Sequence, residues 1–356
     1  MNYRIASLLS SESATTAATK TIDLNVRKPI SRITVQMKAT NNGSVPTAHP
    51  AKMISKIELV DGSNVLASLT GIQAQALNFY ETGRLPLTFL DYRNDVMAIV
   101  TFELNFGRWL WDEVLALDAT KFNNPQLKIS HNLALGGSAP DAATLSVFAH
   151  AFDQKEAKPT GFLMSKEQYS YTLVASAKEK IDLATDLPYR KILVQSLSAG
   201  KQPWENFNKI KLSEDNDAVV IINDESTSDL LKLFSDDPRI IERIVTHGTG
   251  AAQTIYCTPT YDQNCVGMGM DQADTSIFAT QGYGGTESVL GENTVADQYH
   301  VSGRNPHGAM EIPFGRQDEP ADWYNVSKVG SLAMTITGGS GASGTVQIVS
   351  QQVRNY

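Results

Sequence analysis

The chain is poor in cysteine and has no long hydrophobic run. Its two cysteines, Cys257 and Cys265, are too few for a disulfide-rich scaffold or a four-cysteine zinc site. We expect both thiols to be free, the alternative being a disulfide between them if a hairpin brings them within reach. No apolar stretch approaches the roughly 20 residues that a membrane-spanning helix needs, and residues 1–9 lack the apolar core of a signal peptide. These absences predict a protein that is made and folded in the cytoplasm.

Charged residues are also few, at 19% of 356 positions, and the formal net charge is −8. Coating a nucleic acid needs clustered Lys and Arg, so we expect no sequence-specific nucleic-acid partner. The charge is uneven, because residues 1–52 hold seven basic and two acidic side chains, whereas residues 247–303 have no Lys or Arg. Apolar residues reach 42%, which favours folded cores, and the length suits two domains of about 100–150 residues each.

One order of segments occurs twice along the chain. Residues 22–36 (Ile-Asp-Leu, then Pro29, then Arg-Ile-Thr-Val-Gln) have a counterpart at 181–195, displaced by 159 positions at each match. Three further pairs follow in the same order: 56–59 with 209–212, 106–108 with 314–316, and 136–138 with 338–340. Single apolar matches are common, but four in one order indicate an internal duplication.

Both copies have the pattern of short strands. Ile22, Leu24 and Val26 alternate with polar residues, as in a strand with one buried face. Further strands are expected at 30–37, 54–60, 64–69, 96–105, 126–133 and 143–150. Helical patterning is limited to 72–82, its counterpart 227–235, a turn near 114–122 and the segment 319–328. We therefore predict an all-β chain of two tandem eight-stranded jelly-roll β-sandwiches, a double jelly roll with a few short helices.

The expected domain order is an N-terminal arm at 1–19, a first jelly roll at 20–155, a linker at 156–168 and a second jelly roll at 169–356. The interval Gly83–Phe106 covers 23 positions and its counterpart Asp236–Phe314 covers 78, so the second copy carries 55 extra residues at about 240–303. Long loops inside compact domains are usually functional or mobile, so we expect this insertion to lie outside the scaffold.

Several segments resemble a known family. These are Ser55–Gly62 (SKIELVDG) running into Ser68–Gly71 (SLTG), and Phe106-Gly107-Arg108 followed by Asp112 and Asn124–Ile129 (NPQLKI). They are similar to segments of the double jelly-roll major capsid proteins of tailless icosahedral bacteriophages with an internal membrane, which are related to adenovirus hexon. The resemblance implies a chain whose homotrimer presents six similar sandwiches as a pseudo-hexagonal tile.

The resemblance also implies what the protein meets and where it acts. Expected partners are further copies of the chain, neighbouring capsomers, minor capsid or penton proteins, and an internal viral membrane reached through the N-terminal arm. The expected location is the capsid of the virion, after synthesis in the host cytoplasm. A non-enzyme with no cofactor and no metal is expected.

Two other classes remain open. One is a viral spike or carbohydrate-binding β-sandwich module, in which the aromatic residues Trp204, Tyr256, Tyr261 and Tyr283 contact a sugar. The other is a polysaccharide-active enzyme that uses a carboxylate pair such as Asp215 with Asp217 or Asp236 with Asp237. Adjacent acids in turns are usually only solvated, so we name no catalytic residue.

Metal and cofactor sites have weak support in the sequence. The six histidines, His49, His131, His150, His247, His300 and His307, show no spacing that places two ligands on one helix face. The insertion contains four oxygen donors, Asp262, Asn264, Asp271 and Asp274, but their spacing fits no calcium loop. We therefore name no cofactor-binding and no metal-binding residue.

The uneven charge suggests an orientation in a shell. The basic N-terminal segment suits an inner face near anionic lipid. The insertion lacks basic residues and suits the outer face, the alternative being a clamp that packs flat between subunits. Phe106 and Phe314 are expected at equivalent core positions of the two copies.

Overall fold

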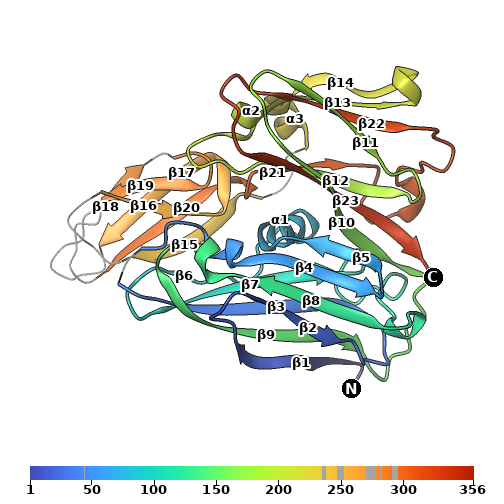
Figure 1. Cartoon of the computed structure of the whole chain (residues 1–356), viewed down its shortest axis with the longest axis horizontal. Helices are drawn as coiled ribbons and strands as arrows, with labels where there is room; N and C mark the ends of the chain where they lie inside the picture. Colours follow the sequence, from blue (N-terminus) through green and yellow to red (C-terminus); the bar gives the residue numbers. More distant parts are fainter. Residues whose placement is uncertain (44, 235–237, 247–251, 270–276, 281, 291–295) are drawn as a thin grey trace.

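The computed structural model describes residues 1–43, 45–234, 238–246, 252–269, 277–280, 282–290 and 296–356. Three β-rich bodies make up the molecule (Figure 1). The N-terminal half forms one sandwich, the C-terminal half forms a second beside it, and a smaller module lies against both at one end.

The first sandwich, roll 1, has two four-stranded sheets. One has the order β1-β9-β3-β7 and the other β2-β8-β4-β5. Their bounds are β1 (Tyr3–Ser13), β2 (Ala18–Asp23), β3 (Ile30–Asn41), β4 (Ile54–Asp61), β5 (Asn64–Leu69), β7 (Met97–Asn105), β8 (Pro125–His131) and β9 (Pro140–Phe152). All pairs inside the two sheets are antiparallel.

The second sandwich, roll 2, repeats this topology strand for strand. Its sheets have the orders β10-β23-β12-β21 and β11-β22-β13-β14. The bounds are β10 (Gly161–Thr172), β11 (Lys178–Leu183), β12 (Tyr189–Gln195), β13 (Phe207–Glu214), β14 (Val219–Ser226), β21 (Ala309–Pro313), β22 (Leu332–Gly338) and β23 (Thr345–Asn355). The predicted duplication and the all-β double jelly-roll fold are confirmed.

The two copies agree at the level of single hydrogen bonds. The Phe106 amide donates to the Ser31 carbonyl at 3.1 Å, and the Phe314 amide donates to the Arg190 carbonyl at 3.0 Å. Ser31 and Arg190 are 159 positions apart, as in the sequence repeat. Phe106 is 1% and Phe314 9% exposed, so the prediction of equivalent core positions is confirmed.

Short helices connect the strands. Helix α1 (Gly71–Thr82) follows β5, and α3 (Thr227–Phe234) follows β14, as predicted from 72–82 and 227–235. A further short helix, α2 (Pro203–Asn206), precedes β13. Single 3-10 turns complete the set: η1 (Pro50–Met53), η2 (Ala119–Lys121), η3 (Leu133–Gly136), η4 (Asp215–Asp217) and η5 (Pro320–Asp322). The predicted helical segment 319–328 is therefore reduced to η5.

The expected arm and linker supply strands instead. Residues of the arm 1–19 form β1, which pairs with β9, and the start of β2. Most of the linker 156–168 belongs to β10, which begins at Gly161. Register shifts between Ser7 and Leu9 and between Leu9 and Glu12 interrupt the alternation of β1, which hid the period-2 pattern in the sequence.

The insertion at about 240–303 is a folded β-module and not a loop. Its strands are β15 (Ile240–Thr246), β16 (Ala252–Tyr256), β17 (Pro259–Gly269), β18 (Ile277–Thr280), β19 (Thr286–Leu290) and β20 (Asp297–Pro306). They form a sheet β18-β17-β20-β15-β6 and a pair β16-β19, where β6 (Leu90–Asp91) comes from roll 1. Leu90 and Tyr92 complete its core, so the module depends on residues distant in sequence.

Candidate functional site: the seam between the rolls and the module junction

The two rolls are joined along a continuous eight-stranded sheet. Strand β5 of roll 1 and β10 of roll 2 lie side by side in parallel, with Ser68 opposite Lys166. Beside this contact, α1 of roll 1 lies against the outer face of the roll 2 sheet (Figure 1). We call this contact zone the seam. Its geometry sets how one sandwich is oriented relative to the other.

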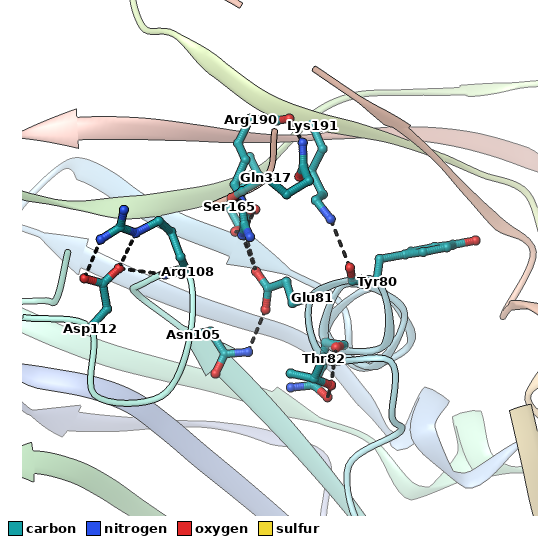
Figure 2. A network of polar contacts seen from close by, with 12 residues as sticks. Tyr80, Glu81, Thr82, Asn105, Arg108, Asp112, Ser165, Arg190, Lys191 and Gln317 are labelled. Carbon is teal, nitrogen blue, oxygen red and sulfur yellow. Dashed lines mark hydrogen bonds and ion pairs between the residues drawn. The ribbon is translucent and has the colours of Figure 1, made fainter. Parts of the chain in front are cut away.

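Local sequence signals determine where α1 starts and stops. Thr70 and Gln73 form a capping box, in which the Gln73 amide donates to Thr70 Oγ1 and the Thr70 amide donates to Gln73 Oε1. Gly83 ends the helix in the left-handed conformation, with φ of 68°. These two ends place Tyr80 and Glu81 in the last turn, where they face roll 2 (Figure 2).

Glu81 is the centre of a buried polar network (Figure 2). Its carboxylate accepts hydrogen bonds from Gln351 Nε2 at 2.5 Å and from Asn105 Nδ2 at 2.6 Å. Arg190 Nη1 lies 3.7 Å from Glu81 Oε1, and the two side chains are only 4% and 3% exposed. One carboxylate therefore joins both rolls, since Asn105 belongs to roll 1 and the other two residues to roll 2.

A second buried ion pair lies next to it. Lys191 Nζ is 2.7 Å from Glu311 Oε2 and donates to the Tyr80 carbonyl at 3.1 Å. The Tyr80 hydroxyl in turn donates to the Ala309 carbonyl at 2.6 Å. Because each donor has a defined acceptor, a shift of α1 along the sheet would leave buried charges unpaired, which is costly.

Burial and charge act in opposite directions on Arg190. Desolvation lowers the pKa of the Arg190 guanidinium, and Glu81 and Glu311 raise it. The indole of Trp323 lies 5.7 Å from the same guanidinium. The group keeps its charge because arginine titrates far above neutral pH, so the seam contains a permanent buried cation.

The β-module is attached to roll 1 through a buried cluster, which we call the junction cluster: His49, Gln75, Glu242, Thr258 and His307. Glu242 on β15 accepts hydrogen bonds from the Thr258 amide at 2.8 Å and the Thr258 hydroxyl at 2.9 Å. His49 Nε2 lies 3.3 Å from Thr258 Oγ1 and 3.8 Å from Glu242 Oε1. His49 precedes η1 of roll 1, so this contact joins the module to the opposite sandwich.

His307 completes the junction cluster. Its ring lies 4.8 Å from that of His49, and His307 Nε2 is 2.8 Å from Gln75 Oε1 on α1. Because Gln75 Oε1 can only accept, His307 carries its proton on Nε2. Burial lowers the pKa of His307 well below its ordinary value, and His49 and Lys52 lower it further. No spacing signal in the sequence pointed to this pair, since 258 positions separate the two histidines.

Both cysteines lie in the core of the module as free, buried thiols. Burial raises the pKa of the Cys257 thiol well above its ordinary value, and Glu242 adds to the effect. Burial and then Glu287 raise the pKa of Cys265 to about 12. Neither group is a thiolate at neutral pH, so neither has the character of a nucleophile.

The other candidate residues do not gather into one site in the described part of the chain. Asp215 accepts the Ser331 amide, and a hydrogen bond from Lys211 lowers the pKa of Asp217. Asp236, Asp237, His247, Asp271 and Asp274 lie outside the described residues. Among described residues, no group of three or more His, Cys, Asp or Glu is arranged to hold a metal ion.

Two of the four candidate calcium donors and two of the four candidate sugar-binding aromatics make side-chain contacts within the protein. Asp262 pairs with Arg239, and Asn264 Oδ1 accepts the Ser302 hydroxyl at 2.9 Å. The rings of Trp204 and Tyr261 meet edge to face at 5.0 Å. The Tyr256 carbonyl accepts the Tyr92 hydroxyl, and Tyr283, which is 36% exposed, lies in a turn before β19.

The chain termini lie at the end of the rolls away from the module (Figure 1). The Met1 carbonyl accepts the Gln154 amide, just after β9. The Tyr356 hydroxyl donates to the Ala116 carbonyl at 2.7 Å, in the connection between β7 and β8. We call this the terminal end. None of the helices in the described residues is long and apolar enough to cross a membrane.

The fold and the seam together define a double jelly-roll protein whose two sandwiches lie side by side and are joined by buried contacts. No protein-family model and no curated protein sequence matches the chain. It is similar to the major capsid protein P2 from bacteriophage PM2, with 10% identity, a TM-score of 0.56, and coverage of 99% of this chain and 98% of that one.

Two further solved structures are similar along the whole chain. The STIV (Sulfolobus Turreted Icosahedral Virus) major capsid protein has 13% identity, a TM-score of 0.58, and coverage of 99% of this chain and 97% of the other. The PBCV-1 virus capsid has 11% identity, a TM-score of 0.50, and coverage of 99% and 94%. At these identities the likeness establishes the fold, and the resemblance noted in the sequence is confirmed at that level.

Proposed function

We propose that this chain is the major capsid protein of an icosahedral virus and that three copies form a pseudo-hexagonal tile of the shell. The observation that carries the proposal is the repeated topology. Two sandwiches with the same strand order stand side by side in one chain, over nearly the full length of three known capsid structures. Three copies would place six similar sandwiches around one axis.

The seam supports this use of the fold. A tile must hold its two sandwiches at one angle, or neighbouring tiles will not meet. The buried pair Arg190–Glu81 and the hydrogen bond from Lys191 to the Tyr80 carbonyl restrict the position of α1 on roll 2, because any displacement of the helix breaks both contacts. A rigid building block without a reaction is the role that this arrangement suits, and no residue is assigned to catalysis.

The two ends of the rolls suggest inner and outer faces. We assign the terminal end to the interior of the shell and the β-module to the exterior, because the two lie at opposite ends of the molecule (Figure 1). Any contact with an internal membrane would then be made by the terminal end and not by a free arm, since β1 is part of a sheet. Minor capsid or penton proteins would meet the sides of the tile.

Mass and microscopy test the proposal. The purified protein is expected to have a mass near three times 38.8 kDa and to form sheets or closed particles visible by electron microscopy. A stable monomer that is retained on a glycan array would contradict the proposal and favour a carbohydrate-binding module. Release of reducing sugar from a polysaccharide would favour an enzyme.

A further inference from the structure

The two copies of the jelly roll differ in how completely equivalent strands are buried. In roll 2, every residue of β12 is buried, because roll 1 covers its outer face. In roll 1, the equivalent β3 is buried on one face only, and Arg32, Thr34, Gln36, Lys38 and Thr40 on its other face are half-buried. Roll 1 therefore has a sheet face whose counterpart in roll 2 is an interface.

A reciprocal difference is found at the opposite edge of each roll. Four of the six residues of β5 in roll 1 are buried, since β10 lies alongside. The equivalent β14 in roll 2 ends its sheet and has β13 as its one strand partner among the described residues. Its consecutive residues Val219, Val220 and Ile221 are 51%, 41% and 39% exposed. Leu233 on the following α3 is 71% exposed.

We infer that β14 and α3 of one copy dock on β1 and the outer face of β3 and β9 in the next copy, repeating the seam between subunits. The inference rests on the proposed trimer and names its contact surfaces. The contact is head to tail, so the same two surfaces are used at every junction, and the ring closes when the rotation at each seam is one sixth of a turn.

The ion pair at the seam has a counterpart on the outer face of β3 and β9 in roll 1, which we call the open face. Lys191 and Glu311 of roll 2 correspond in position to Arg32 and Glu103 of roll 1, which form an ion pair at 2.9 Å. Charge around the two surfaces is complementary. β14 and α3 carry three acidic side chains and one basic one, whereas β1, β3 and β9 carry three basic and two acidic ones.

The open face is more polar than the seam. Leu193 and Val349 of roll 2 pack into the core of roll 1, and their counterparts on the open face are Thr34 and Phe148. A polar surface can stay in water before assembly, whereas the seam is formed once, during folding. The contact between subunits is therefore reversible and should weaken as salt rises.

Chemical cross-linking tests the docking directly. By sheet position, Ala6 corresponds to Lys166, and the irregular step at Asn223 and Asp224 corresponds to Ser68, which meets Lys166 at the seam. A chain carrying both Ala6→Cys and Asn223→Cys, treated with a short bismaleimide, is expected to give covalent dimers and trimers. Each single variant is expected to stay monomeric on a denaturing gel. The native thiols are buried, so the wild type is the background control.

The mass measured before cross-linking separates two kinds of failure. Trimers that do not cross-link in the double variant, or an Ala6→Cys chain that cross-links to itself, would overturn the docking and leave the trimer intact. A monomeric wild-type protein would overturn both the docking and the proposed function.

A substitution on β14 gives an independent readout. Val220→Lys should weaken trimer formation about tenfold or more, because it places a charge in a buried contact. Val174→Lys is the matched control, since Val174 is an exposed valine of roll 2 outside β14 and α3 (63% exposed), and it should leave the trimer unchanged. Equal monomer stability in both variants would show that folding is intact. Equal trimer affinity in both would contradict the inference.

Discussion

At the residue scale, two equivalent phenylalanines are expected to stabilise the cores of the two copies of the repeat. Phe106 and Phe314 follow equivalent strands, donate equivalent backbone hydrogen bonds and lie in separate cores. Their predicted equivalence came from the motif Phe-Gly-Arg, which occurs at the same place in the order of matching segments in both copies. The junction cluster has no such motif, and its members were visible only after folding.

Replacing either phenylalanine by alanine should lower the free energy of unfolding by about 3–5 kcal/mol, since a large buried ring leaves a cavity. Urea unfolding of the variants checks this. Phe89→Ala is the control, because Phe89 is 50% exposed and should lose far less. A loss at Phe314 no larger than at Phe89 would show that the second core does not depend on this ring.

Acid should destabilise the protein through His307. Its folded pKa lies well below the ordinary 6.5, so below about pH 6.5 the unfolded state binds a proton that the folded state does not. As the pH drops below 6.5, this group should therefore lower the free energy of unfolding by about 1.4 kcal/mol per pH unit. Above pH 6.5 the folded protein should have the full contribution of the neutral His307 to its stability. His131 and His150, whose pKa values burial also lowers, add to the slope.

The variant His307→Gln isolates this contribution, because glutamine can still donate to Gln75 but does not titrate. Its unfolding free energy, measured from pH 7.5 to 5, should depend less steeply on pH than that of the wild type. His300→Gln, at an exposed position on β20, is the control. Parallel curves for wild type and His307→Gln would exclude this histidine as the source.

At the element scale, the seam depends on the contact between α1 and β12. The helix was predicted from its apolar spacing. Its two ends follow local rules, because Thr70 and Gln73 form a capping box at the start and Gly83 takes the left-handed conformation at the end. Which surface the helix would cover was not predictable. A lysine in a strand is usually exposed to solvent, yet Lys191 is only 1% exposed because roll 1 covers it.

Lys191→Met should lower the free energy of unfolding by about 3–5 kcal/mol, since Glu311 is left buried without its partner. The double variant Lys191→Met/Glu311→Leu should recover most of this loss. Lys56→Met is the matched control, because Lys56 is 51% exposed in its pair with Glu58 and should lose less than about 1 kcal/mol. Equal losses for Lys191→Met and Lys56→Met would show that the seam pair contributes no more than a surface pair.

At the scale of the whole molecule, the module and the terminal end define a direction. The module is inserted in roll 2 but shares its sheet and core with roll 1, through β6 and Tyr92. It is therefore fixed to both rolls at one end. The exposed Trp109 lies in the connection after β7 at the terminal end, where Trp111 stacks on Tyr3.

Thiol labelling of intact particles tests the direction. A Val266→Cys variant, in the module, should react with a membrane-impermeant maleimide, whereas Trp109→Cys should react only after the particles are opened. Val266 and Trp109 are 43% and 51% exposed, so the two positions have similar solvent exposure in the isolated chain. The reverse pattern would contradict the orientation. Protection of both until dissociation would support a module clamped between subunits.

The sequence alone determined the duplication, the strand-rich class and the two longer helices. Each follows from local periodicity, from turn and cap residues, or from the order of matching segments. The similarity to a capsid family was visible for the same reason, since scaffold motifs are local in sequence.

Only the tertiary structure decided which surfaces are covered. The arm became β1, the insertion became a module completed by Leu90 and Tyr92, and His49 met His307 across the junction. These contacts join residues tens to hundreds of positions apart, and local patterning does not encode such distances. Burial of β12 and partial exposure of β3, two strands with similar sequences, follow from the packing of one roll against the other.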